Sequence, residues 1–200
     1  AISLLRNLVE HKSGLGQKPE VFALLALFCF HAARFDARSD ANNKQILLEK
    51  QDYELWNQRL INFGEQFLNK ASTGTTLTVY HLEAAIACLH TRIYLPETEK
   101  WKQITVYYKQ LLSMSDTLLG RISLIVAVYK SEEVQEAYQL WTNLFDKAKN
   151  NYFFQQLGFH IYKALNEELK AKECLSAALS LANSEAEKLH IEGMIAEFSK

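Results

Sequence analysis

The chain has 200 residues, which is enough for one large domain or two small ones with a buried core. Its apolar (48%) and charged (22%) fractions are those of ordinary globular proteins, and its formal net charge of −1 argues against binding of nucleic acid by surface charge alone. With only seven Gly and two Pro, the chain lacks the turn residues that all-β folds require, so helices are favoured.

Apolar residues recur at three- and four-residue spacing along nearly the whole chain, which is the pattern of amphipathic helices. Helix starts are marked by Pro19, by Thr78, by Ser131 with two acidic residues after it, and by Ser184 with Glu187 in a capping box. We expect an all-α protein of about ten helices stacked as antiparallel pairs. The predicted helices cover about residues 2–11, 19–35, 52–71, 78–93, 97–114, 117–129, a seventh after Ser131, 152–165, 168–181 and a tenth after Asn183 or Ser184.

Residues 36–50 interrupt this pattern with turn formers such as Asp40, Asn42 and Asn43, followed by the apolar pair Leu47–Leu48. We predict a structured polar loop near 36–50 with a packed tail, and Asp52 as the cap of the next helix. A polar loop of this length is usually functional or disordered, and its apolar residues argue against disorder. Two interpretations stay open: a polar network that satisfies itself, or a docking site for a partner.

The second half of the chain has repeat character. Small and aliphatic residues resemble a tetratricopeptide unit whose halves are one residue further apart than is standard, and a weaker copy precedes it. The unit consists of Leu157–Gly158, Ile161, Ala171, Leu175 and Ala178. The weaker copy consists of Leu124, Val128, Ala137 and Trp141. We therefore predict right-handed α-solenoid character, with an N-terminal helical part (1–114) and tetratricopeptide-like helix pairs (115–200) packed as one continuous domain.

The sequence contains little that suits catalysis or metal binding. Cys29, Cys88 and Cys174 lie in apolar helical runs, which predicts buried free thiols in a reducing compartment. No His pair has the spacing of a zinc helix, the residues after Asp40 fail as a calcium loop, and no nucleophile elbow exists. The longest apolar stretch, Val21 to Phe30, is about half a bilayer span. We expect a cytoplasmic protein that is not an enzyme and has no catalytic residue, cofactor, metal or membrane partner.

A resemblance emerges from residues around the polar loop. The sequence there resembles the C-terminal tetratricopeptide-like extension of certain bacterial extracytoplasmic-function RNA polymerase sigma factors. The residues that carry this resemblance are Ala33–Arg34 through Arg38, Asp40, Leu47–Leu48–Glu49, Gln51–Asp52 and Trp56. Matches to this family continue on both sides, for example at Tyr80, His90 and Trp101. The chain departs from it at Asn42–Asn43, where Asp-Gly is usual, and at His81 and Glu83, where glutamines are usual.

The resemblance implies a regulatory, protein-interaction domain acting in transcription initiation. The promoter-reading regions of such factors are missing from this segment, which begins at Ala1 in a helical pattern, so we expect a piece of a longer protein. The implied partners are the sigma regions of the same polypeptide, RNA polymerase or a regulatory protein, with no direct contact to nucleic acid. The residues expected in a partner-binding site or structural polar network are Arg34, Asp36, Arg38, Asp40, Gln51, Asp52, Trp56, Tyr80 and His90.

Two other functions are considered beside this one. The first is a freestanding helical-repeat scaffold that binds a peptide or protein in a groove, which the partner it captures would reveal. The second is an enzyme with a polar site around Asp36, Arg38, Asp40 and Asp52, which would need a deep pocket with converging carboxylates. We also expect Trp56 to be largely buried.

Overall fold

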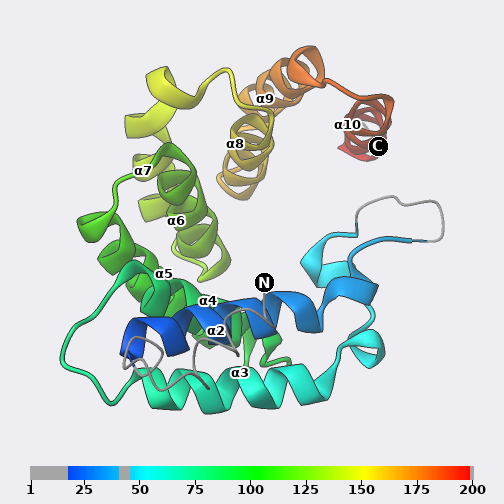
Figure 1. Cartoon of the computed structure of the whole chain (residues 1–200). Coiled ribbons are helices and arrows are strands. Elements are labelled where there is room, and N and C mark those ends of the chain that lie inside the picture. The colour runs from blue at the N-terminus through cyan, green and yellow to red at the C-terminus, as the bar shows by residue number, and fades with distance from the viewer. Residues whose placement is uncertain (1–17, 41–45, 199–200) are drawn as a thin grey trace. The chain divides into compact units, whose positions relative to one another are not determined.

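The computed structural model describes residues 18–40 and 46–198, and the regular elements in these ranges are all helical (Figure 1). The predicted all-α class is therefore confirmed for this part of the chain, while the predicted helix at 2–11 and the turn at Asn42–Asn43 lie outside it. No helix in the two described ranges has the length and apolar character that crossing a membrane requires. The α-helices are α2 (Pro19–Ala33), α3 (Gln58–Ala71), α4 (Val79–Thr91), α5 (Glu97–Met114), α6 (Leu118–Lys130), α7 (Val134–Ala148), α8 (Tyr152–Ala164), α9 (Glu168–Leu181) and α10 (Glu185–Phe198).

The chain divides into two compact units, the first ending at Leu95 and the second beginning at Pro96, with Ser113–Ser115 grouped with the first. The boundary expected after residue 114 thus lies at the other end of α5. Polar contacts explain why α5 belongs to the second unit: Lys109 Nζ lies 2.8 Å from Glu136 Oε1, and the hydroxyl of Thr98 donates to Glu132.

In the first unit, α2 packs against both α3 and α4. The helix is apolar on most sides, and Leu25, Ala26 and Phe30 are fully buried. Gly64 allows α3 to approach closely, because a Cβ atom there would lie 2.7 Å from the ring of Phe30. Its position between α3 and α4 is consistent with its uniform apolar character.

The helix predicted to begin at Asp52 begins instead at Gln58. The carboxylate of Asp52 accepts the N–H of Glu54 and caps a short 3-10 helix, Tyr53–Leu55. Asn57 caps α3 by accepting the N–H of Leu60. Two successive capping side chains therefore divide a segment that apolar spacing alone joined into one helix.

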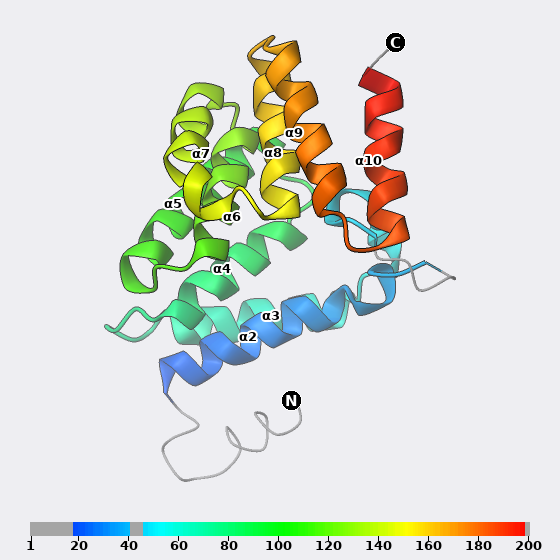
Figure 2. The ribbon, with the colours of Figure 1, turned by 90° about the horizontal axis from the view of Figure 1, so that it is seen from above.

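In the second unit, two helix pairs repeat with a period of about 34 residues, which is the period of tetratricopeptide repeats. The caps of α6 and α8, Thr117 and Asn151, lie one period apart, and each accepts the N–H three residues onward. The turns within the pairs are also one period apart and place Glu132 (φ 69°) and Asn166 (φ 59°) in the left-handed region. Figure 2 shows the helices of this unit side by side as pairs.

One predicted cap in this unit is wrong. Ser131 does not cap α7; its hydroxyl donates to the carbonyl of Val128 at the end of α6, and Glu133 is the N-cap residue. Glu132, in the left-handed conformation, lies between Ser131 at the end of α6 and Glu133 at the start of α7. A non-glycine residue in that conformation is difficult to foresee from the sequence. The predicted box at the last helix is confirmed, since Ser184 Oγ accepts the N–H of Glu187 and the carboxylate of Glu187 accepts that of Ser184.

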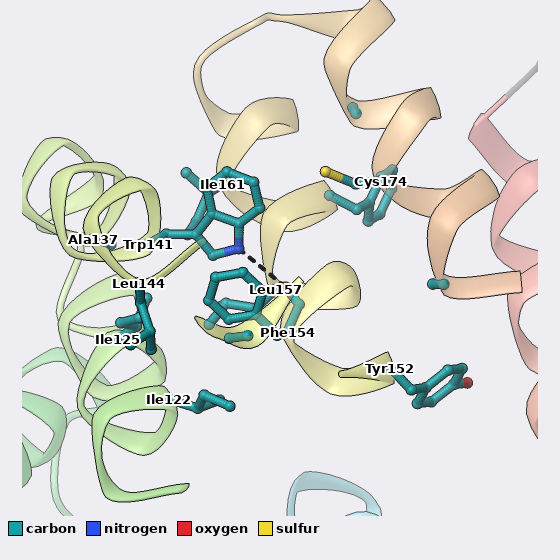
Figure 3. Close-up of a cluster of buried hydrophobic side chains, with 14 of the residues drawn as sticks. Ile122, Ile125, Ala137, Trp141, Leu144, Tyr152, Phe154, Leu157, Ile161 and Cys174 are labelled. Atoms are coloured by element: carbon teal, nitrogen blue, oxygen red, sulfur yellow. Dashed lines mark hydrogen bonds between the residues drawn. The ribbon is translucent and has the colours of Figure 1, made fainter. Parts of the chain in front are cut away.

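The core of the second unit is centred on α8, which lies between α7 and α9 (Figure 3). The indole of Trp141 stacks on Phe154 at a ring separation of 5.0 Å, and its N–H donates to the carbonyl of Phe154. Beside them, a Cβ atom on Gly158 would lie 2.7 Å from Trp141 and 2.9 Å from Cys174 Sγ. Gly158 therefore permits two neighbouring helices to approach α8 at one level.

This close approach gives a paired prediction. Gly158→Ala should lower the free energy of unfolding by about 1–3 kcal/mol, because Trp141 and Cys174 would have to move. Gly193→Ala on α10 is the control, since a Cβ atom there meets nothing within 4 Å, and better helix propensity should raise stability by about 0.5–1 kcal/mol. Urea unfolding measures both, and a Gly158→Ala protein as stable as the unmodified chain would contradict the packing described here.

Candidate functional site

The residues singled out around the polar loop lie in the first unit, where α2 passes into α3 through three short 3-10 helices: Phe35–Ala37, Leu48–Lys50 and Tyr53–Leu55. Besides the bonds within its short helices, two backbone hydrogen bonds join parts of this segment that are distant in the sequence. The N–H of Asn57 donates to the carbonyl of Ala33 at 2.8 Å, and that of Ile46 to the carbonyl of Arg38 at 2.8 Å. The chain therefore folds back on the end of α2.

Trp56 is the anchor of the segment. Only 4% of it is exposed, as expected from the sequence, and it packs in one cluster with Ala33 and Ala37. The edge of Tyr53 meets the indole at a ring separation of 4.8 Å, and the guanidinium carbon of Arg34 lies 5.9 Å from its centre. Arg34 thus gains a cation–π contact in a largely desolvated place.

Three buried polar atoms of this segment have no hydrogen-bond partner in the described structure: Arg34 Nε, Gln51 Oε1 and Trp56 Nε1. Gln51 uses only its amide nitrogen, which donates to the carbonyl of Ile46. Each orphaned group carries a desolvation cost of about 1–3 kcal/mol. A polar network in which every group finds a hydrogen-bond partner, one of the two interpretations of the loop, therefore does not describe these three atoms.

Positive groups gather at the end of α2. Burial lowers the pKa of Arg34 to about 10, and the neighbouring charge of Arg38 contributes to that shift. Partial desolvation, followed by the charges of Arg34 and Arg38, lowers the pKa of His31. Arg38 Nη2 lies 3.0 Å from His31 Nδ1, a contact in which Nδ1 accepts and the imidazole is neutral.

The structure brings together only part of the predicted set. Arg34, Arg38, Gln51 and Trp56 lie in one segment with the contacts above. Asp36, Asp40 and Asp52 are exposed at the surface, and Asp52 serves as a cap. Tyr80 and His90 lie on α4, about 15 Å apart along the helix axis, so they cannot meet the same ligand atom.

His31 and the exposed apolar side chains of the segment are not among the predicted site residues. His31, Arg34 and Arg38 are separated by three and four residues, so helical spacing alone could have grouped them. The exposed side chains are Phe35 (72%), Leu47 (58%), Tyr53 (40%) and Leu55 (52%). These exposed apolar side chains make the segment a candidate for contact with a partner.

The described residues offer little that suits catalysis or a metal. No group of three His, Cys, Asp or Glu side chains within 18–40 and 46–198 could hold a metal ion. Cys29, Cys88 and Cys174 are buried and free, as predicted, and burial raises the pKa of Cys29 and of Cys174 to about 11. These thiols therefore stay protonated at neutral pH and are poor nucleophiles.

A pocket of about 380 Å³ lies within the second unit, at the end of α5 and between α6 and α7. Its polar lining is dominated by one ion pair, in which the guanidinium of Arg121 meets both oxygens of Asp116 at 2.6 and 2.5 Å. That pair holds the pKa of Asp116 below its usual value, so the carboxylate is a weak base. The remaining lining residues are Leu112, Leu124, Ile125, Leu140, Asn143 and Leu144.

Comparisons with known proteins give two similarities. A protein family of unknown function (DUF6596) matches residues 1–72. A protein of Rhizobium meliloti (strain 1021), described as uncharacterized, is 29% identical over 174 residues, which are 87% of this chain and 41% of that protein. The chain thus spans less than half the length of this curated relative. No solved structure matches the chain.

Trp56→Ala should lower the free energy of unfolding by about 3–5 kcal/mol, because it empties a buried aromatic site. Tyr94→Ala, at a side chain that is 75% exposed in the same unit, should change it by less than about 0.5 kcal/mol. Urea unfolding compares the two. Equal curves for Trp56→Ala and the unmodified chain would show that the segment does not depend on its indole.

The lowered pKa of His31 predicts a pH dependence. Its pKa in the folded state lies below the ordinary 6.5, so protonation favours the unfolded chain. The contribution of His31 to stability should be complete above pH 6.5 and decline as the pH falls toward the folded-state pKa. Arg38→Gln should raise the pKa of His31, whereas Arg59→Gln on α3 should not. NMR titration of the imidazole protons measures this, and a His31 pKa at or above 6.5 would be evidence against the arrangement.

Proposed function

We propose that this chain is the regulatory, protein-interaction part of a bacterial RNA polymerase sigma factor. The observation that carries the proposal is the segment anchored by Trp56, which contains several of the residues that resemble the sigma-factor extension. Arg34 and Trp56 are in direct contact there, and Gln51 is buried in the same segment. A stretch that merely linked two helices would not require a buried indole, a buried guanidinium and a buried amide.

The character of this segment supports binding rather than catalysis. Its carboxylates are exposed and do not converge, while its exposed apolar side chains are suited to contact with a protein surface. The partners that we propose are the sigma regions of the same polypeptide, RNA polymerase or a regulatory protein. The relative from Rhizobium meliloti has further sequence beyond the matched region, which is compatible with a module of a longer protein.

The test uses the full-length factor in transcription from its own promoter. Deleting residues 18–198 should change promoter activity, and the double variant Leu47→Ser with Leu55→Ser should change it in the same direction. Both leucines are more than half exposed, so the fold should tolerate the substitutions. Tyr94→Ser, at an exposed side chain outside the segment, is the matched control and should have no effect.

Unchanged transcription after the deletion would contradict the regulatory role. An effect of the deletion without an effect of the double variant would place the contact elsewhere in the chain. A freestanding scaffold, the alternative function, would instead be supported if the chain were produced alone and captured a peptide unrelated to transcription.

A further inference from the structure

The pocket of the second unit joins an apolar lining to a few polar side chains. The apolar lining consists of Leu124, Ile125 and Leu144, which are buried, and of Leu112 and Leu140, which are half-buried. Its volume of about 380 Å³ is at the small end of the range for pockets that hold small molecules, about 300–1,000 Å³. The pocket therefore has the size and the lining to receive a small hydrocarbon body.

The polar side chains come from the start of α6 and from α7. Asp116 precedes the capping residue of α6, and Arg121 reaches back from inside the helix to hold it by two hydrogen bonds. This pair fixes the guanidinium in one orientation and leaves its other N–H groups without a partner among the described residues. Asn143 on α7 likewise has no hydrogen-bond partner within 18–40 and 46–198, so its amide is available to a ligand. Lys147 follows one turn later on the same helix.

The balance of charge at the pocket is positive. The hydrogen bonds from Arg121 are the main cause of the lowered pKa of Asp116, and the charge of Lys147 adds to the effect, so this lysine also acts at the pocket. One carboxylate thus faces two cations, which leaves one positive charge over. Further along α7, Glu136 is paired with Lys109 and adds no net charge.

These features together select one class of ligand. A hydrocarbon body would cover the apolar lining and remove its surface from water. The unused N–H groups of Arg121 and Asn143 are suited to an acceptor, and the remaining positive charge favours an acceptor that is ionised. A cationic head group would be repelled by Arg121 and Lys147, and a neutral one would gain nothing from their charge.

We propose that the pocket binds a small carboxylic acid with an aliphatic body, of the type of a medium-chain fatty acid. Its chain would lie against Leu112 and Leu140. Its carboxylate would accept hydrogen bonds from Arg121 and Asn143. The inference goes beyond the proposed function, because it concerns the second unit and does not depend on the segment anchored by Trp56. A ligand in the pocket contacts α5, α6 and α7 together, so its binding stabilises the packing of these helices.

Isothermal titration calorimetry of the whole chain with sodium octanoate tests the site. Octanoate should bind saturably and with a single equivalent, and added salt should weaken the binding because the head group is charged. Octanol and octylammonium chloride have the same chain length but not the same charge, so both should bind about fivefold more weakly or worse. At saturating concentration, octanoate should also raise the Tm of the chain.

Variants separate the contribution of the head group from that of the chain. Asn143→Asp should raise the Kd for octanoate about tenfold, because it removes a donor and adds a like charge. Lys147→Glu should raise it about threefold, and neither variant should change the Kd for octanol. Leu140→Ser should weaken the binding of both ligands. The matched controls, Asn62→Asp on α3 and Lys188→Glu on α10, are at exposed positions and should leave both Kd values unchanged.

Three results would overturn the inference: no saturable binding of octanoate, binding of several equivalents as in adsorption to the surface, or octylammonium binding as tight as that of octanoate. Equal weakening by the pocket variants and the control variants would reject the pocket as the site. Circular dichroism verifies that each variant keeps its helices. Since transcription does not enter these measurements, octanoate binding by a chain whose deletion leaves transcription unchanged would reject only the proposed function.

Discussion

The close approach of three helices at Gly158 is the constraint on which the second unit depends. Trp141 from α7 and Cys174 from α9 both occupy the space that a side chain at this position would fill. The indole fixes the level of contact further, because its N–H is committed to the carbonyl of Phe154. Since a buried donor without a partner is costly, sliding α7 along α8 would lose both the packing and the hydrogen bond.

That constraint explains why two short turns can organise a whole unit. The turns at Glu132 and Asn166 have the same length and the same left-handed middle residue, so they return the chain at the same angle twice. Successive pairs then present equivalent residues on the same side, as repeat proteins do. The same geometry places Ala137 and Ala171 at equivalent buried positions of the two pairs. It also places Leu119 and Phe153 at equivalent positions on the surface.

The presence and type of the helices could be predicted from the sequence, because apolar spacing reports the buried face directly. The predicted helix boundaries were wrong where local interactions compete. Asp52 and Ser131 are both good capping residues by type, yet Asp52 caps a 3-10 helix and Ser131 donates a hydrogen bond back to α6.

In the candidate site, Trp56 and Arg34 could likewise be selected by type and position. The orphaned atoms around them could not be foreseen, since they depend on which partners the fold brings near. The predicted carboxylates failed to join them because the short helices leave residues such as Asp36 at the surface.

The segment anchored by Trp56 offers a partner two kinds of contact. The segment of the first unit combines exposed aromatic and aliphatic side chains with a cluster of His31, Arg34 and Arg38, in which like charges oppose one another. An arriving carboxylate would relieve that opposition.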